Sequence, residues 1–350
     1  MPKRIGYLYE KVLTIENCTE AVLVGTKNLK KTPKIRRIRE NADKWGQRIL
    51  DTLSSGWIPA PTREKIINDG TEGKERHLCI PKTFDHLCHV AIMLPIIGLL
   101  TKRFDFYCCG SVPGRGPKRV EYAIKSWTRT GHPIKYAGEA DIHHAYQTLG
   151  VDAVMAALRR FIKDENYLRW HEQILEQMGG YLAIGFQPSH WYFNLVMSRG
   201  DRIIRNHCRG IKMVRYMDNY WFASNRKRKI HTAVSILKTE LCRLGMKLNH
   251  AYQVFPTVSR SITALSYRYF VGYSVMRKST MHELSKRIKI AGQRMTAHLS
   301  RSGVSRIGIL RRCNSYSFRK QYIYPVFSIK RAKELISRAD KKCLLRQASR

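Results

Sequence analysis

The sequence is poor in acidic residues. Its 350 residues include 26 aspartates and glutamates against 64 lysines and arginines, which gives a formal net charge of +38 at pH 7. A protein with this imbalance repels itself unless a polyanion neutralises it. Nucleic acid is therefore the first partner we expect, and an anionic membrane the second. A generic basic surface is the alternative, but +38 lies far outside the net charge of ordinary small domains.

Paired cysteine motifs are also absent. The nine cysteines include no CxxC pair, so the spacing typical of structural zinc sites is missing. The adjacent Cys108 and Cys109 are poor evidence of a metal site. This pattern predicts reduced, mostly structural thiols in a cytosolic protein.

Long apolar runs are missing as well. The most apolar segment, VAIMLPIIGLL at residues 90–100, is too short to span a bilayer and is interrupted by Pro95. We expect it to form a buried helix. The N-terminal sequence MPKRIGYLYEKV lacks the apolar core of a signal peptide. We therefore expect a cytoplasmic protein with no membrane association.

A glycine-rich stretch lacks the nucleotide-binding P-loop motif. Residues 107–127, YCCGSVPGRGPKRVEYAIKSW, form a basic glycine loop that opens a predicted helix. Such a loop can bring backbone N–H groups close to phosphate. No GK[ST] follows, so the P-loop match fails. A plain loop-to-helix connection and a phosphate cradle both remain open.

The sequence contains two isolated acids at the ends of predicted strands. Residues 134–150, IKYAGEADIHHAYQTLG, predict a strand that ends at Asp141 before a turn into a helix. Residues 214–224, VRYMDNYWFAS, predict a hairpin with Asp218 at its tip. If these strands pair in one sheet, the two carboxylates converge and can hold a pair of divalent cations for an in-line displacement. Spacing alone leaves open that both are ordinary turn residues.

The ordered set of motifs resembles the palm of a reverse transcriptase. The similarity is strongest to the bacterial branch that includes diversity-generating retroelements and the unknown-group, defence-associated enzymes. EADIHHAY resembles the first catalytic block, IGFQPSHWYFN the glycine–serine–asparagine block, and RYMDN the YxDD box. LGMKLN, YFVGY, IPKTFDHLCHVAI and YCCGSVPGRGPKRVEYAI resemble further blocks. The resemblance runs in order from about residue 62 to residue 275.

This resemblance implies an α+β fold of the right-hand polymerase type. We expect fingers, palm and thumb, with an antiparallel palm sheet against packed helices. The implied division is a basic N-terminal helical extension (1–60), the fingers and palm (61–275) and a basic, helical, thumb-like region (276–350).

The resemblance also implies the metal site. Asp141 and Asp218 would be the catalytic residues and would hold two Mg²⁺ ions, with Mn²⁺ as a substitute. The carbonyl of Ile142 would be an additional ligand. Asn219 stands where relatives normally carry a second aspartate, so we interpret it as a marker of a subgroup. We expect activity to survive this change, because the residue beside the tip need not bind both ions.

Further residues receive roles from the same resemblance. In the dNTP site, Tyr146 would act as a steric gate against a 2′-hydroxyl, with Lys74, Arg76 and Gln187 beside the nucleotide. A core aromatic residue and an exposed strand charge are the alternatives for Tyr146 and Arg76. The residues implied to handle template and primer are Gly185, Ser189, Asn194, Tyr216 and Gly272, with Asn194 bracing the loop that contains Gly185, Gln187 and Ser189. Pro188 and His190 depart from the usual pattern of that loop.

The implied activity is RNA-directed DNA polymerisation from dNTPs. We expect the protein to copy an associated structured non-coding RNA into a DNA product, in antiphage defence in a bacterial cell. Copying of a template repeat in diversity generation is one alternative, and a catalytically silent RNA-binding scaffold is another. The aromatic Tyr146 disfavours an RNA-dependent RNA polymerase. A homo-oligomer or a second protein subunit is also a candidate partner.

Overall fold

The computed structural model describes the chain except for residues 1–3, 30–31, 70–73, 250–251 and 349–350. The described chain forms two compact units. The first comprises residues 1–69, 75–120 and 136–254, and the second residues 70–74, 121–135 and 255–350. The predicted division at residues 60 and 275 follows sequence motifs, whereas this one follows packing. As a functional division, the predicted one stays a prediction.

The N-terminal helices belong to the core of the first unit. They are α1 (Leu8–Val12), α2 (Ile15–Lys27), α3 (Pro33–Glu40) and α4 (Ala42–Ser54). The side chain of Thr14 caps α2 by accepting the N–H of Asn17, as short polar residues before a helix commonly do. Leu8, Val22 and Ile49 are buried in the same apolar cluster as the centre of the longest helix of this unit. Residues 1–60 are thus part of a shared core.

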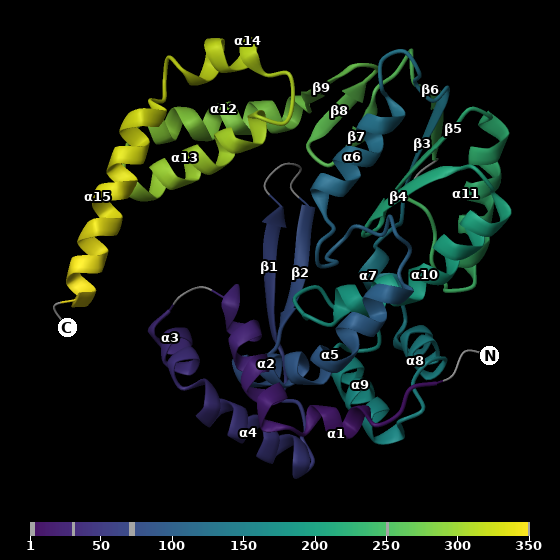
Figure 1. Cartoon of the computed structure of the whole chain (residues 1–350), viewed down its shortest axis with the longest axis vertical. Coiled ribbons are helices and arrows are strands. Elements are labelled where there is room, and N and C mark those ends of the chain that lie inside the picture. The colour runs from purple at the N-terminus through teal and green to yellow at the C-terminus, as the bar shows by residue number, and fades with distance from the viewer. Residues whose placement is uncertain (1–3, 30–31, 70–73, 250–251, 349–350) are drawn as a thin grey trace. The chain divides into compact units, whose positions relative to one another are not determined.

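Two strands and the predicted buried helix follow. The strands β1 (Arg63–Asp69) and β2 (Lys74–Ile80) form a two-stranded sheet, and the helix is α5 (Thr83–Arg103) (Figure 1). Helix α5 contains Pro95 and continues through it. Among the described helices, α5 alone is long and apolar enough to cross a membrane, and 56% of that window is buried inside the structure. Its burial is that of a core helix, as the sequence predicts.

A four-stranded sheet carries the two predicted strand-end acids. Its order is β4-β5-β3-β6, with β3 (Tyr136–Asp141) antiparallel to β5 (Asn219–Ser224) and β4 (Lys212–Tyr216) antiparallel to β5. The edge strand β6 is Gln253–Pro256. The expected pairing of the two acid-bearing segments is therefore confirmed, and so is the α+β class.

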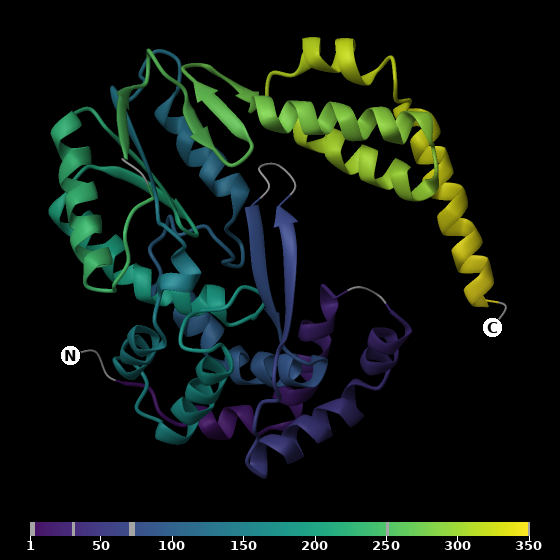
Figure 2. The ribbon, with the colours of Figure 1, turned by 180° about the vertical axis from the view of Figure 1, so that it is seen from behind.

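Five helices complete the first unit: α7 (Ala145–Thr148), α8 (Val151–Arg159), α9 (Glu165–Gln177), α10 (Ser189–His207) and α11 (Lys227–Cys242). Helix α6 (Pro117–Trp127) begins in the first unit and continues into the second at Glu121. Helix α11 packs on β3 and β5, where Ile230, Ala233 and Leu237 are buried (Figure 2). The spacing of these residues places them on one helix face, as the amphipathic sequence predicts.

The second unit combines a small sheet with a helical bundle. The sheet is β7 (Ile262–Ala264), β8 (Tyr267–Phe270) and β9 (Tyr273–Met276), in that antiparallel order. The helices are α12 (Lys278–Gln293), α13 (Ala297–Leu310), α14 (Tyr316–Phe318) and α15 (Ile329–Ala348), with a π-helical turn, η1, at Arg319–Ile323 (Figure 2). Gly303 allows α13 to approach the ring of Phe327, because a Cβ atom there would lie 2.6 Å from the ring. The basic C-terminal region is helical, as the sequence predicts.

Candidate active site

The sheet register brings the two predicted acids together. Asp141, the last residue of β3, pairs with Asn219, the first residue of β5. Asp218 lies in the two-residue loop between β4 and β5, directly before Asn219. The backbone N–H of Ile142 donates to the carbonyl oxygen of Asp218 at 3.2 Å. The ends of both acid-bearing strands are thus joined by hydrogen bonds.

The turn that presents Asp218 is strained. Met217, the other loop residue, has a φ of 55°, in the left-handed region that a non-glycine residue avoids. The carbonyl oxygen of Met217 accepts from Nη1 of Arg215 at 3.2 Å. Gly110 packs so close that a Cβ atom there would lie 2.5 Å from the Met217 nitrogen. The surrounding chain therefore holds this turn in place and fixes the position of Asp218.

Asp218 lies in an environment that disfavours its charged form. Burial is the largest effect and raises the pKa of its carboxyl group, and the negative charge of Asp141 raises it further. Nδ2 of Asn219 donates to Oδ1 of Asp218 at 2.9 Å. This hydrogen bond and the charge of Arg76 act in the opposite direction but leave the pKa raised. Burial and the charge of Asp141 therefore outweigh the interactions that favour the charged form of Asp218.

This donor set fits a hard divalent cation. Among the described residues, no cluster of three or more His, Cys, Asp or Glu residues could hold a metal ion. Mg²⁺, however, is commonly bound through one or two carboxylates, with water and substrate phosphates completing its shell. Two adjacent carboxylates that raise each other's cost of ionisation supply that minimal set. The expectation for Asp141 and Asp218 is consistent with this arrangement, and the Ile142 carbonyl stays a prediction.

Asn249 supports Asp141, and the sequence interpretation did not identify it. Its backbone N–H donates to the carbonyl oxygen of Asp141 at 2.7 Å, and its Nδ2 donates to Oδ2 of Asp141 at 3.2 Å. Ile142 and Leu248 form an antiparallel bridge beside these contacts. The signal was the segment LGMKLN, whose last residue is Asn249. Asn249 thus fixes the orientation of one carboxylate from outside the strand pair.

A buried charged network lies behind the turn, and sequence reasoning missed it. Arg215 and Asp201 have side chains that are 0% exposed and form an ion pair at 2.8 Å. The Tyr220 hydroxyl donates to Oδ1 of Asp201 at 2.8 Å, and Nη1 of Arg215 donates to Oδ1 of Asn194 at 2.8 Å. Burial is the largest single effect and lowers the pKa of Arg215, but the charge of Asp201, the other acidic groups nearby and the hydrogen bond to Asp201 together raise it above its usual value. A signal was available, since Asn194 and Asp201 stand seven residues apart and so share one face of α10.

Tyr146 lies against the same turn. Its hydroxyl donates to Sδ of Met217 at 3.5 Å, and its ring stacks on Phe193 with centroids 5.2 Å apart. Burial, and then the charge of Asp218, raise the pKa of its hydroxyl. Tyr146 is only half-buried and borders the carboxylate pair, so its position is compatible with the predicted steric gate. The stack on Phe193 was not predicted.

The fingers hairpin reaches the site through β2. Arg76 is exposed, and its charge acts on Asp218. The N–H of Cys79 donates to the carbonyl oxygen of Ile184 at 2.9 Å, which attaches β2 to the loop that contains Gly185. Lys74 begins β2, but its side chain lies outside the described residues.

The loop between α9 and α10, which lies against β2, needs glycine at one position. Gly185 has a φ of 115°, and a Cβ atom there would lie 2.4 Å from the carbonyl oxygen of Cys79. Ser189 is buried and donates to the carbonyl oxygen of Ala183 at 2.6 Å, which closes the loop. Oε1 of Gln187 is buried and has no hydrogen-bond partner in the part of the chain that the structure describes. These contacts explain how the loop is shaped.

Asn194 has a different role from the one expected. It was expected to brace the loop that contains Gly185, but its Nδ2 donates to the carbonyl oxygen of Gly110 at 2.8 Å. Together with its contact to Arg215, this bond places Asn194 in the network behind the turn. Its side chain is fully buried, and its role at template or primer stays a prediction.

The basic glycine loop is a structural connection to the active-site turn. The N–H of Cys109 donates to the carbonyl oxygen of Arg215 at 2.8 Å, and the Arg215 N–H donates to that of Tyr107 at 3.0 Å. Nη1 of Arg115 donates to the carbonyl oxygen of Cys108 at 3.2 Å. The loop thus extends the β4 strand pairing, which favours the plain connection over the phosphate cradle.

Two predicted residues remain. Tyr216 ends β4 and pairs with Asn219, so it lies beside the turn. Gly272 belongs to the second unit, where its N–H donates to the carbonyl oxygen of Thr128 at 2.8 Å. Their roles at the primer and template stay predictions.

Comparisons with known proteins agree with this geometry. A family model described as "Reverse transcriptase (RNA-dependent DNA polymerase)" matches residues 69–269, which is more than half of the chain. No curated protein sequence matches the chain.

Solved structures give the fold. Telomerase from Candida albicans, in complex with a TWJ fragment of telomeric RNA, superposes with a TM-score of 0.50 and 12% identity. The match covers 85% of this chain and 65% of the telomerase chain, so this chain spans less than two thirds of that protein. Apo telomerase from Candida tropicalis, truncated from its C-terminal domain, gives a TM-score of 0.43 at 12% identity, covering 67% of this chain and 58% of that one. The predicted right-hand polymerase architecture is confirmed by the family and the first of these folds.

Proposed function

The chain belongs to the reverse transcriptase (RNA-dependent DNA polymerase) family, and from this premise we propose that it is an RNA-directed DNA polymerase acting through Asp141 and Asp218. The observation that carries the proposal is the juxtaposition of these two carboxylates. The charge of one raises the pKa of the other at the end of a strained, well-supported turn.

The two carboxylates are proposed to hold two Mg²⁺ ions, with Mn²⁺ able to replace them. Bound there, the ions would activate the primer 3′-hydroxyl and stabilise the leaving pyrophosphate. The chain's own contribution is placement. Asn249 orients Asp141, the Asn219 amide orients Asp218, and the Arg215 network holds the turn.

Selection of the nucleotide is proposed to involve two side chains. The half-buried ring of Tyr146, supported by Phe193, would occupy the space that a 2′-hydroxyl needs. Arg76 is exposed close enough for its charge to act on Asp218, so it can also meet the triphosphate with its planar fork of donors.

The template is proposed to be a structured non-coding RNA, in antiphage defence in the cytoplasm of a bacterial cell. The net charge of +38 supports a stably bound RNA, because phosphate contacts dominate such complexes. The departures Asn219, Pro188 and His190 support the defence branch. Copying of a template repeat for diversity generation is the alternative role. A variable target gene with a matching repeat near the coding gene would favour that alternative.

A catalytically silent RNA-binding scaffold is the second candidate function. The observation that favours it is Asn219, whose amide removes one negative charge from the position next to Asp218. An amide still supplies a neutral oxygen, and the two remaining acids are sufficient for Mg²⁺. The polymerase is therefore the better supported reading.

Primer extension on an RNA template separates these functions. Purified protein is given a DNA-primed RNA template with Mg²⁺ or Mn²⁺ and either dNTPs or rNTPs. We expect a DNA product from dNTPs, none from rNTPs, and none from the variant Asp218→Ala. Product from rNTPs alone would indicate an RNA polymerase, and no product under any condition would indicate the scaffold. Normal activity of Asp218→Ala would refute the assignment of the site.

A further inference from the structure

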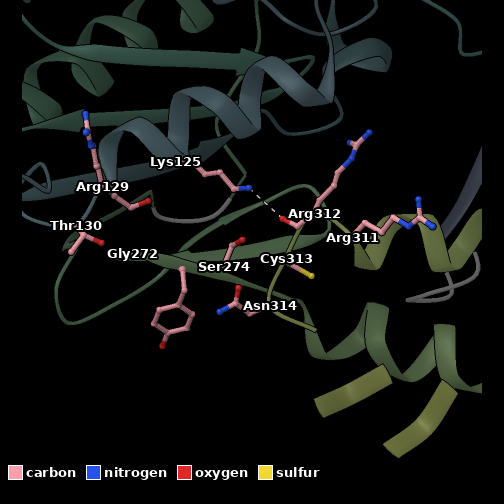
Figure 3. Close-up of a pocket in the computed structure, with 11 residues that line it drawn as sticks. Lys125, Arg129, Thr130, Gly272, Ser274, Arg311, Arg312, Cys313 and Asn314 are labelled. Carbon is pink, nitrogen blue, oxygen red and sulfur yellow. Dashed lines mark hydrogen bonds between the residues drawn. The ribbon is translucent and has the colours of Figure 1, made fainter. Parts of the chain in front are cut away.

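A basic cavity lies within the second unit and does not include the carboxylate pair. Its volume is about 440 Å³, and its cations are Lys125 of α6, Arg129 in the segment after α6, and Arg311 and Arg312 directly after α13. The hairpin between β8 and β9 closes another side with Gly272 and Ser274 (Figure 3). In the close-up, Lys125 turns toward the carbonyl oxygen of Arg312, to which it donates at 3.3 Å. The guanidinium groups of Arg129 and Arg312 extend to opposite sides of the rim.

The cavity has more positive charge than its one acidic neighbour balances. Glu121 pairs with Lys125 at 2.8 Å and lies 4.0 Å from Arg312. In the part of the chain that the structure describes, neither Arg129 nor Arg311 has an ion-pair partner within 4.0 Å. An anionic chain that crosses the rim would therefore meet two uncompensated guanidinium groups. Phosphodiesters fit them, since arginine donates in a planar fork.

A second cavity adjoins the first and has a different character. It has a volume of about 600 Å³, and its walls include Met276, Met281, Leu310 and Phe318. This volume lies in the range of small-molecule sites, and the mixture of apolar walls with a few polar groups is typical of them. Tyr316 stands at this cavity with 68% of its surface exposed. A large exposed aromatic ring beside an apolar cavity can stack on a flat partner.

The second cavity also has an unused hydrogen-bond donor. Arg319 lines it, and Nε of Arg319 is buried without a hydrogen-bond partner among the described residues. A buried donor without a partner is costly unless a ligand or water accepts from it. The carbonyl and ring-nitrogen acceptors of a nucleobase are suited to that position.

The two cavities share part of their walls. Cys313 and Asn314 line both, and the backbone N–H of Asn314 donates to the carbonyl oxygen of Ser274 at 2.8 Å. Burial raises the pKa of the Cys313 thiol, so this shared wall carries no thiolate that would repel phosphate. A basic rim and an apolar cavity therefore lie next to each other across one turn of chain.

We propose that these adjoining cavities bind one unpaired nucleotide of an RNA strand. Its base enters the apolar cavity and stacks on Tyr316, while the phosphodiester backbone crosses the rim at Arg129 and Arg311. The base must be unpaired, because a base within a duplex is stacked and not free to enter a side pocket. The choice of RNA over DNA rests on the proposed function, since RNA is the single strand that a reverse transcriptase copies.

Binding without catalysis tests the proposal. Fluorescence anisotropy is measured without divalent metal or dNTPs, with the variant Asp218→Asn as the background protein. The probes are a fluorescein-labelled single-stranded RNA, the same strand as DNA, and a blunt RNA duplex. Because neither metal nor chemistry is involved, failure of the polymerase assignment would leave this measurement unaffected.

The substitutions Tyr316→Ala and Arg311→Ala probe the two cavities. We expect each to weaken single-stranded RNA binding about tenfold and duplex binding little. For Tyr316, stacking of one base on an aromatic ring contributes about that much. Tyr316→Phe keeps the ring and should bind as the background does. Matched controls are Tyr122→Ala and Arg338→Ala, exposed residues of the second unit that line neither cavity. Equal losses from these controls would reduce the effect to general surface charge and overturn the proposal.

A strand with abasic sites separates base from backbone. On abasic RNA, Tyr316→Ala should have no effect, while Arg311→Ala should still weaken binding. On intact RNA, the double variant should lose less than the product of the single losses, because one nucleotide contacts both cavities. Independent losses, or an undiminished Tyr316→Ala effect on abasic RNA, would refute a shared nucleotide. Equally tight, Tyr316-dependent binding of DNA would refute the choice of RNA.

Discussion

Two buried acids near the β4–β5 turn, Asp218 and Asp201, lie in opposite electrostatic environments. At the turn, Asp218 faces the like charge of Asp141, and burial and repulsion raise the pKa of its carboxyl group. Behind the turn, Asp201 is fully buried, yet Arg215 and Tyr220 satisfy it completely. The first arrangement disfavours the charged form of Asp218, whereas in the second a guanidinium group is paired with the acid.

This difference separates a binding group from a supporting group. A buried carboxylate with a guanidinium partner is costly to disturb, because removing either member leaves a charge without compensation. A buried carboxylate beside a like charge is costly to ionise, and a divalent ion that binds there lowers this cost. Ionised aspartate therefore has opposite effects on stability at Asp218 and at Asp201, and substitutions can test this.

The largest expected effect on stability is at the buried Asp201–Arg215 pair. Asp201→Asn removes the negative charge that balances Arg215, and we expect unfolding to become easier by about 3–5 kcal/mol. Urea denaturation followed by circular dichroism measures the change. The exposed Asp152→Asn is the matched control and should change stability little. If Asp201→Asn lowered the free energy of unfolding by less than about 1 kcal/mol, Asp201 would not differ from Asp218 in its effect on stability.

Tyr146 borders the Asp141–Asp218 carboxylate pair, and its substitution tests how the nucleotide is selected there. Tyr146→Ala should reduce discrimination between dNTPs and rNTPs by about tenfold to a hundredfold, as expected from about 1–3 kcal/mol of steric selection. The ratio of kcat/KM values for dGTP and GTP measures it. Tyr146→Phe keeps the ring and loses only the hydroxyl contact to Met217, so its discrimination should be unchanged. Unchanged discrimination in Tyr146→Ala would place the gate elsewhere.

The same reasoning predicts that a buried ionisable group with no counter-ion stays neutral. His171 is such a group. This histidine is fully buried, and burial lowers its pKa from 6.5 to about 3. Only the unfolded chain takes up a proton between these values, so stability is present above pH 6.5 and falls as the pH falls toward 3. The slope should be about 1.4 kcal/mol per pH unit for this group.

His171→Asn should flatten that slope while keeping a polar contact to the Tyr192 hydroxyl, which lies 2.6 Å from Nδ1 of His171. Urea denaturation from pH 7 to pH 4.5 gives the comparison. An unchanged slope in the variant would mean that His171 is protonated in the folded protein.

A smaller effect on stability, of opposite sign, is expected at Asp218. In EDTA at neutral pH, Asp218→Asn should melt at the same temperature as the unsubstituted protein or higher. The folded pKa of Asp218 is raised above its ordinary 3.8, so ionisation opposes folding at higher pH and ceases to do so as the pH falls. The advantage of the variant should therefore shrink with falling pH. A melting temperature several degrees below that of the unsubstituted protein would contradict the account.

The smallest expected effect is at Asn219. Asn219→Asp exchanges a hydrogen-bond donor to Asp218 for another negative charge. Primer extension should be retained or raised, and half-maximal activity should need less Mg²⁺, because an additional carboxylate strengthens the binding of a hard cation. Complete loss of extension would show that the amide hydrogen bond itself is required.

The sequence predicted the strand ends better than their support. Period-two patterns and turn residues are local, so the hairpin at Asp218 and the strand ending at Asp141 could be placed, and their pairing was confirmed. The apolar run at residues 90–100 was predicted to be a buried helix, and α5 confirms this with Pro95 inside it.

Contacts between distant segments could not be predicted in the same way. Asn194 was placed on the wrong partner, because its bonds to Gly110 and Arg215 depend on how α10 meets the turn. The Arg215–Asp201 pair joins residues whose individual positions look ordinary. Asn249 reaches Asp141 across 108 positions of sequence. Periodicity carries no information about such pairings.

The most direct test combines activity and folding in one variant. Metal-stripped protein and its Asp218→Asn variant are compared for melting temperature and for single-turnover primer extension on an RNA template after Mg²⁺ is added. The account predicts that the unsubstituted protein extends the primer only with Mg²⁺, and that the variant melts at least as high yet extends at least a thousandfold more slowly, about 4 kcal/mol in barrier. Extension by the variant at the unsubstituted rate, or loss of its fold, would contradict the claim that Asp218 is there to hold the metal.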